Sequence, residues 1–234
     1  MIKYVKKLKR KFIDSNDNNK SVFYNTLGAF AVKGGALIVS LLTLPAYIRY
    51  FDNQQVLGLW FTLLSVLSWV LTFDLGIGNG LRNYLVPALV QKDNLRIRKY
   101  ISSAYVSIGF VVVVSSLVSL ILFKFFNWNV IFNISDSVIS RQTLSLSVWI
   151  IFLGILLQFI LNLINSILYA MQKSALVSFL TLLSSIITLL YVLFAKTSDV
   201  SSNLITLSIV RVIAVNLPLL ITTIIIFSKR LKNC

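Results

Sequence analysis

Three charged side chains, Lys33, Asp74 and Arg211, interrupt long apolar stretches of the sequence. A charge placed at the centre of a bilayer costs about 2.5–3.5 kcal/mol on insertion scales, so such residues usually face a partner or a water-filled cavity. These three residues are therefore the first candidates for a substrate or ion pathway.

Lys33 and Asp74 have opposite charges and fall at similar depth in the first two apolar stretches. At about 1.5 Å of rise per helical residue, both lie roughly 12–14 Å from the same membrane surface. Two interpretations stay open. The pair can be a structural ion pair that neutralises two costly groups, or it can open when an ion or an anionic substrate competes for one partner.

Arg211 has no acidic residue at a similar depth in the sequence. An unpaired guanidinium at that depth suits a wet cavity that accepts an anion. Alternatively, the helix begins later than predicted and the side chain snorkels to the outer membrane interface.

A stripe of polar side chains runs along the fourth apolar stretch. Its members follow one another at steps of three or four residues, which places them on one helical face: Gln158, Asn162, Asn165, Tyr169 and Gln172. Either they line a hydrophilic cavity, where amide and phenol groups suit sugar hydroxyls, or they hydrogen-bond to neighbouring helices.

Few other residues of the sequence are of types that bind metals or carry out catalysis. The chain has no histidine and a single cysteine, Cys234, so the usual metal ligands, general bases and internal disulfides are missing. Gly76, Gly78 and Gly80 do not form a nucleotide-binding loop, because no Gly-Lys-Ser/Thr follows them. We therefore predict no enzymatic activity and no cofactor or metal.

The composition places the chain in a membrane. Of its 234 residues, 57% are hydrophobic and 12% are charged, and the mean hydropathy is +0.87. Soluble proteins use charged residues for about a quarter of their positions. The net charge is +15, but the cations flank the apolar stretches. This placement fits anionic membrane lipids, which attract each such cation by about 1 kcal/mol, better than nucleic acid.

Six apolar stretches are long enough to cross a bilayer, which takes about 20 helical residues. They are too long and too evenly apolar for barrel strands, and only helices or closed barrels satisfy their backbone in lipid. We therefore predict an all-α integral membrane protein, with residues 1–234 forming one six-helix bundle. The predicted spans are residues 24–48, 57–82, 101–126, 143–169, 175–195 and 204–227.

Most lysines and arginines fall in segments on one side of these six spans. The positive-inside rule then predicts that both termini are cytoplasmic. Residues 1–12 carry Ile2, Val5, Leu8 and Phe12 on one helical side with lysines between them. This segment suits either a helix on the inner membrane surface or a disordered basic tail.

Three stretches carry a resemblance to a known family. Residues 25–50 read NTLGAFAVKGGALIVSLLTLPAYIRY, residues 57–83 read LGLWFTLLSVLSWVLTFDLGIGNGLRN, and residues 100–105 read YISSAY. Together they resemble the start of the Wzx-type O-antigen and polysaccharide flippases of the multidrug/oligosaccharidyl-lipid/polysaccharide exporter superfamily. The most specific parts are Gly-Leu-Trp at 58–60 and the run at 73–83. The resemblance covers residues 20–105 and is only compositional beyond them.

The resemblance implies about twelve helices in two six-helix lobes around a central cationic cavity. Such proteins move undecaprenyl-pyrophosphate-linked sugar repeat units across the bacterial inner membrane, by alternating access and ion coupling without ATP. Lys33, Asp74 and Arg211 would then lie in the wall of that cavity. The two cations would meet the pyrophosphate, and the polar stripe would meet the sugars of the lipid-linked oligosaccharide.

Six spans correspond to the N-terminal lobe alone. A truncated gene product, a fragment, and a half-size protein that forms a homodimer in place of a second lobe are all compatible with this. A drug or metabolite exporter of the same superfamily is the main alternative function, although its substrates are often cationic. An inactive half-transporter is another. An enzyme acting on lipid-linked sugars would show clustered Asp, Glu or His, which the sequence lacks.

Overall fold

The computed structural model describes residues 27–28, 30–72, 76–123, 125–195 and 199–229. Over these residues the chain forms helices and no strand, and six helices are long and apolar enough to cross a membrane. The prediction of an all-α, six-span membrane protein is confirmed. The six are a first helix over Phe30–Phe51, α2 (Gln54–Thr72), α4 (Asn94–Leu122), α6 (Arg141–Ala170), α7 (Ser174–Phe194) and α8 (Val200–Lys229).

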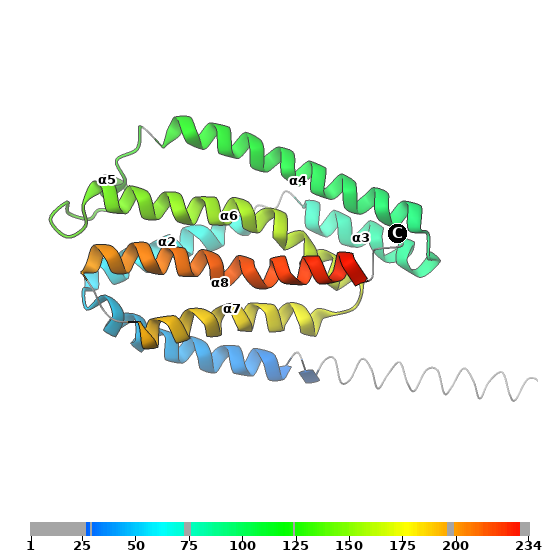
Figure 1. Ribbon diagram of the computed structural model, residues 1–234, viewed down its shortest axis with the longest axis horizontal. Helices are drawn as coiled ribbons and strands as arrows, with labels where there is room; N and C mark the ends of the chain where they lie inside the picture. The colour runs from blue at the N-terminus through cyan, green and yellow to red at the C-terminus, as the bar shows by residue number, and fades with distance from the viewer. Residues whose placement is uncertain (1–26, 29, 73–75, 124, 196–198, 230–234) are drawn as a thin grey trace, which may run out of the picture.

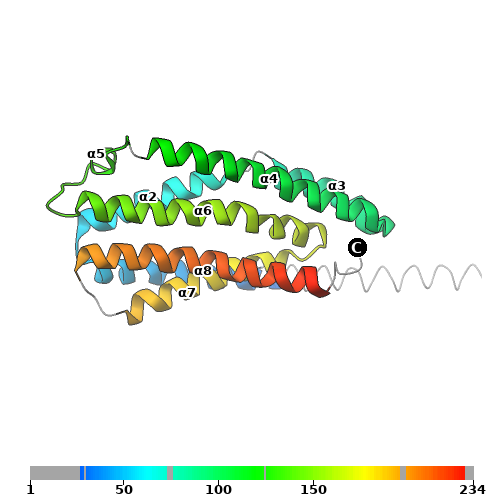
Figure 2. The same cartoon turned by 45° about the horizontal axis from the view of Figure 1, so that its top comes forward.

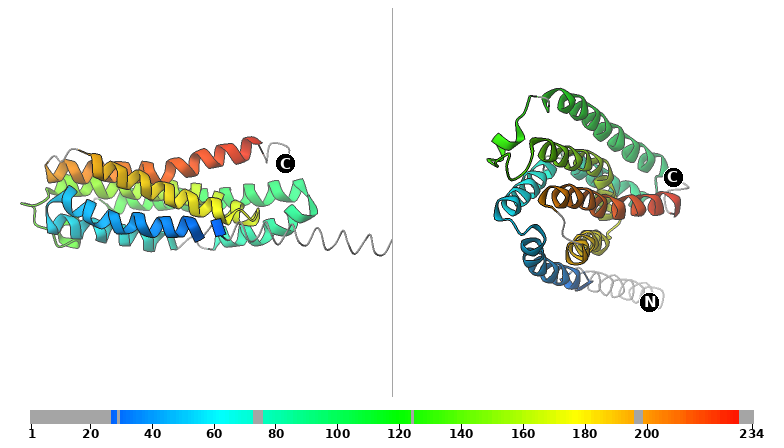
Figure 3. Two further views of the ribbon diagram at one scale, coloured as in Figure 1. Left: turned by 90° about the horizontal axis from the view of Figure 1, so that it is seen from below. Right: turned by 60° about the vertical axis from the view of Figure 1, so that its left-hand side comes forward.

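The six long helices run side by side in an elongated bundle, and two short helices join them (Figure 1). These are α3 (Ile77–Gln91), which follows α2, and α5 (Trp128–Ile131), in the connection from α4 to α6. α6 and α8 form the centre of the bundle, where α6 packs against α8, α3, α4, α7 and α2 (Figure 2). The first helix and α4 lie at the periphery (Figure 3).

The connections between helices gather at two ends. We call the end that holds α5 and the turns into α2 and α8 the outer end, and the opposite end, with the α3–α4 and α6–α7 turns, the inner end (Figure 1). Among the described cations of the connections and adjacent helix ends, the outer end has Arg49 and Arg141. The inner end has Lys92, Arg96, Arg98, Lys99 and Lys173. By the positive-inside rule, this asymmetry predicts that the inner end faces the cytoplasm.

The predicted span over residues 57–82 is wrong as a single helix. α2 ends at Thr72, and α3 begins at Ile77 after Gly76, which adopts a left-handed backbone with φ of 73°. Glycine enters this region at little cost because it has no Cβ. Hydropathy misses the break because apolar residues continue on both sides of it.

α4 extends beyond the predicted start of the third span at residue 101. α4 begins at Asn94, because Asp93 accepts a hydrogen bond from the Arg96 amide at 3.1 Å and so caps the helix. The charged first turns of α4 are helical without being apolar, so a hydropathy criterion excludes them. The spans predicted for α6, α7 and α8 agree with the structure to within about one turn. Residues 1–12 lie outside the described part.

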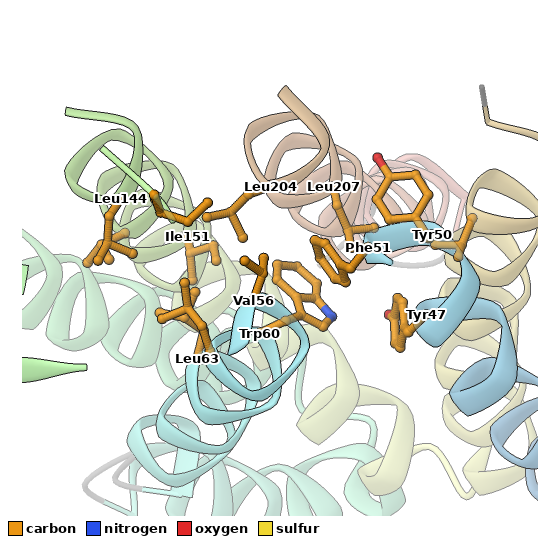
Figure 4. Packing of buried hydrophobic residues seen from close by; sticks show 14 of the residues in the cluster. Tyr47, Tyr50, Phe51, Val56, Trp60, Leu63, Leu144, Ile151, Leu204 and Leu207 are labelled. Atoms are coloured by element: carbon orange, nitrogen blue, oxygen red, sulfur yellow. The ribbon is translucent and has the colours of Figure 1, made fainter. Parts of the chain in front are cut away.

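Large apolar side chains from the outer halves of five long helices, the first helix, α2, α6, α7 and α8, pack together in a cluster that we call the outer cluster (Figure 4). Phe51 from the first helix and Trp60 from α2 are 1% and 0% exposed, with ring centroids 6.1 Å apart. Leu204 and Leu207 of α8 pack against them together with Ile151 of α6. This packing fills the space between these helices near the outer end with buried apolar side chains.

α6 and α8 cross at very close range. A Cβ atom on Gly154 of α6 would overlap the side chain of Val212 on α8. One turn further along α8, the Asn216 side-chain amide donates to the Gly154 carbonyl at 3.1 Å. Small residues allow this kind of backbone approach between helices in a membrane. α6 and α8 therefore form a closely packed pair, and α2 and α7 both pack against it.

Candidate functional site

A cavity of about 230 Å³ lies inside the bundle, on the inner side of the outer cluster. The α6–α8 pair forms its floor, and α2 and α7 form its walls. We call it the polar cavity, because eight of the side chains that line it are polar: Gln158, Asn162, Asn165, Thr181, Ser184, Ser185, Arg211 and Asn216.

α2 and α7 lie on either side of the polar cavity. Over their described residues these two helices do not pack against each other, although each packs against both α6 and α8. Leu64 and Leu71 line the cavity from α2, and the exposed Thr181 lines it from α7. The first helix lies next to both, because its Tyr47 ring packs against Trp60 and Phe61 of α2 and its Gly35 approaches Leu182 of α7.

Arg211 is the only charged side chain among the described residues that line the polar cavity. It follows the first three turns of α8, away from the outer end of that helix. No carboxylate in the described part of the chain forms an ion pair with it, and the described ion pair joins Arg96 to Asp93 instead. The Tyr47 phenol of the outer cluster lies close enough to Arg211 to interact with it electrostatically. A positive charge thus stands in the cavity without a described counter-ion.

Three members of the predicted α6 stripe, Gln158, Asn162 and Asn165, line the cavity together. The Asn165 amide donates to Asn162 Oδ1 at 2.6 Å, along the same helix. Asn165 Oδ1 is buried and has no hydrogen-bond donor in the described structure. In that part of the chain we find no hydrogen bond from these three side chains to another helix, so the amides stay directed at the cavity.

Tyr169, the fourth member of the predicted site on α6, lies outside the cavity. Its side chain is 39% exposed, and the Arg82 guanidinium of α3 lies 5.3 Å from the centroid of its ring. This cation–π contact joins the inner end of α6 to α3. The structure therefore places Tyr169 at a helix contact and not beside Asn162.

Lys33 does not line the polar cavity either. It is exposed near the inner end of the first helix, whose Gly35 approaches Leu182 of α7. Its predicted partner, Asp74, lies outside the described residues. The Lys33–Asp74 pair therefore stays a prediction.

Four polar residues of the cavity were not predicted from the sequence, and Asn216 is the most buried of them, at 5% exposure. Its amide nitrogen donates to the carbonyls of Gly154 and Val212 at 3.1 and 3.0 Å, and its Oδ1 is buried without a donor. A lone amide within an apolar helix was the signal that could have found it.

The other three missed residues are hydroxyls on α7. Thr181, Ser184 and Ser185 each donate to a carbonyl four residues earlier in the same helix, at 3.0–3.2 Å. Because each proton is used in this way, each oxygen remains available as an acceptor. Their spacing of three and four residues on one helical face was the available signal.

The arrangement combines one cation with amide and hydroxyl groups in a membrane-embedded groove. A guanidinium suits phosphate or carboxylate, and amides and hydroxyls suit neutral polar groups such as sugar hydroxyls. The volume of about 230 Å³ is below the usual range of about 300–1,000 Å³ for sites that enclose a drug-sized ligand. The groove can thus hold one part of a large cargo and not the whole of it.

The chain matches no protein-family model, no curated protein and no solved structure. The comparisons therefore add no family, substrate or activity to the fold and the polar cavity described above. The resemblance to polysaccharide flippases stays a prediction.

Proposed function

We propose that this chain forms half of a transporter that moves an anionic, lipid-linked oligosaccharide across the bacterial inner membrane. The cargo would be an undecaprenyl-pyrophosphate-linked O-antigen or capsular repeat unit, and an ion gradient would drive its movement. The observation that carries the proposal is Arg211, which stands among amides and hydroxyls in a groove between membrane-spanning helices.

Each part of this cargo has a counterpart in the groove. Arg211 would bind the pyrophosphate, since a guanidinium matches phosphate oxygens in charge and geometry. Asn162, Asn165 and Asn216 would bind the sugar next to it. The polyprenyl chain would stay in the bilayer.

The size of the cavity also calls for a second half. A cavity of about 230 Å³ is too small to enclose a lipid-linked oligosaccharide and shield its charge from lipid. A second six-helix lobe, or a second copy of this chain, would supply the rest of the binding site. Rocking of two such halves around a site near the membrane midplane is a general route to alternating access.

Export of a drug or metabolite is the alternative function. Exporters of cationic compounds need an acidic site, whereas the only charged side chain among the described lining residues is Arg211. An inactive half-transporter is the third candidate.

Binding by the purified chain separates the two transport functions. We expect geranylgeranyl pyrophosphate, a short polyprenyl probe, to bind and neutral geranylgeraniol to bind at least tenfold more weakly. Arg211→Gln should weaken pyrophosphate binding about tenfold or more, since a hydrogen bond to a charged group contributes about 1.5–3 kcal/mol. Arg98→Gln, which removes the same charge from an exposed position on α4, should leave binding unchanged. Preferential binding of tetraphenylphosphonium, a lipophilic cation, would instead support drug export.

Complementation then tests transport. The chain would be expressed in a bacterial strain that lacks its O-antigen flippase, alone and together with the C-terminal half of a flippase. Immunoblots of the polysaccharide show whether O-antigen production is restored. Restoration by the chain alone or with the C-terminal half, and its loss with Arg211→Gln, would support the proposal. If neither condition restores production although the chain inserts into the membrane, the chain is an inactive half.

A further inference from the structure

A second groove lies at the outer end of the bundle, where α4, α5 and α6 meet, and it shares no lining residue with the polar cavity. Its volume is about 470 Å³. The Phe123 ring at its base packs against Trp128 and Trp149, with ring centroids 4.8 and 4.2 Å away. We call it the aromatic groove. Its apolar lining also includes Leu120 and Phe126.

Arg141 is the only charged side chain among the described residues that line the aromatic groove. It is the first residue of α6, and its Nε donates to Asn127 Oδ1 at 3.2 Å. That hydrogen bond orients the guanidinium and leaves its two terminal nitrogens without a partner in the described structure. The groove therefore has apolar walls and one oriented cation with free donors.

The surroundings of the aromatic groove are apolar as well. Phe125 and Val130 are 80% and 73% exposed, and Phe126 and Ile131 are also exposed. All four residues follow the end of α4 at Leu122, in the connection to α6. Aromatic and apolar side chains exposed at this depth are typical of a segment that rests in the membrane interface. The molecules that reach the groove are therefore those of the bilayer surface.

We infer that the aromatic groove binds an anionic phospholipid of the outer leaflet. The phosphate would accept hydrogen bonds from Arg141, and an acyl chain would lie along Leu120 and Trp149. A sugar fits less well, because Arg141 and Ser145 are the only polar side chains in the described lining. A zwitterionic headgroup also fits less well. Its ammonium group would lie near the Arg141 guanidinium, and no carboxylate among the described lining residues could pair with that ammonium.

Tryptophan quenching in nanodiscs tests this inference. The full chain carrying Trp69→Phe would be placed in phosphatidylcholine discs, because Trp69 is 65% exposed and would report any lipid. Trp128 and Trp149 then report the groove, whereas Trp60 is fully buried. Increasing fractions of phosphatidylglycerol or phosphatidylcholine with brominated acyl chains serve as quenchers.

We expect brominated phosphatidylglycerol to quench at about threefold lower mole fraction than brominated phosphatidylcholine, the size of effect that an exposed ion pair supports. Arg141→Gln should abolish the difference, and Arg141→Lys should keep it. Arg49→Gln, which removes a guanidinium at the same end but outside the groove, should also keep it. Equal quenching by the two lipids would overturn the inference. Loss of quenching on adding maltose would overturn it in favour of a sugar site.

Discussion

Single polar atoms decide what the polar cavity can bind. Asn165 Oδ1 and Asn216 Oδ1 are both buried acceptors without a donor in the described structure. A buried polar atom left unpaired costs about 1–3 kcal/mol. Both oxygens have almost no accessible surface, so a cargo would reach them only after the amide side chain rotates toward the cavity. The proposed selectivity for a negative group therefore depends on Arg211.

Asn216 also has a structural role that can be measured. Asn216→Ala removes the hydrogen bond to the Gly154 carbonyl, the described polar contact across the α6–α8 crossing. Interhelical hydrogen bonds in membrane proteins contribute about 0.6 kcal/mol on average and up to about 1.7. We expect a loss of stability of this size, measured by unfolding in mixed detergent micelles. Asn83→Ala, at an exposed amide of α3, should cause no loss. Equal stability of the two variants would contradict this role.

At the scale of elements, the floor of the cavity depends on how closely α6 and α8 approach. Gly154 has no side chain, and Val212 is β-branched and therefore held in few rotamers. The overlap that a Cβ on Gly154 would create cannot be relieved by a simple rotation. The two helices would have to separate, which would also lengthen the Asn216 hydrogen bond.

Gly154→Ala should therefore lower stability by about 1–3 kcal/mol, the usual cost of an overpacked core. Val212→Ala in the same chain should restore part of it, because it removes the methyl groups that the new Cβ meets. The thermal midpoint of the purified protein in detergent is the measurement. Gly109→Ala on α4, where a Cβ has no neighbour within 4 Å, is the matched control and should be neutral or stabilising. A double variant no more stable than Gly154→Ala alone would count against this packing.

At the scale of the whole molecule, the two ends differ in charge and in what they expose. Basic side chains collect at the inner end, around the α3–α4 hairpin, and aromatic side chains collect at the outer end, around α5. The positive-inside rule and the interfacial preference of aromatic residues thus act together on orientation. The polar cavity lies between these ends, on the inner side of the outer cluster.

The orientation can be tested with matched Ser→Cys variants in a Cys234→Ser background, since Cys234 is the only cysteine of the chain. Ser137→Cys lies on the exposed outer loop, and Ser174→Cys lies on the exposed start of α7 at the inner end. We expect a membrane-impermeant maleimide to label Ser137→Cys in intact cells and to label Ser174→Cys only after the membrane is opened. The reverse pattern would show that the bundle is inverted.

The sequence by itself determined the membrane class, the six spans and the asymmetry of charge, because these depend on composition along the chain. It also singled out Arg211 and the α6 amides, since a polar group in an apolar helix stands out locally. The tertiary structure alone decided which of these residues meet. Asn162 and Asn165 share a cavity with Arg211, whereas Tyr169, on the same helical face as they are, packs against Arg82. The physical reason is that periodicity assigns a side chain to a face of its own helix. Which helix covers that face depends on contacts such as Gly154 with Val212, between residues far apart in the sequence.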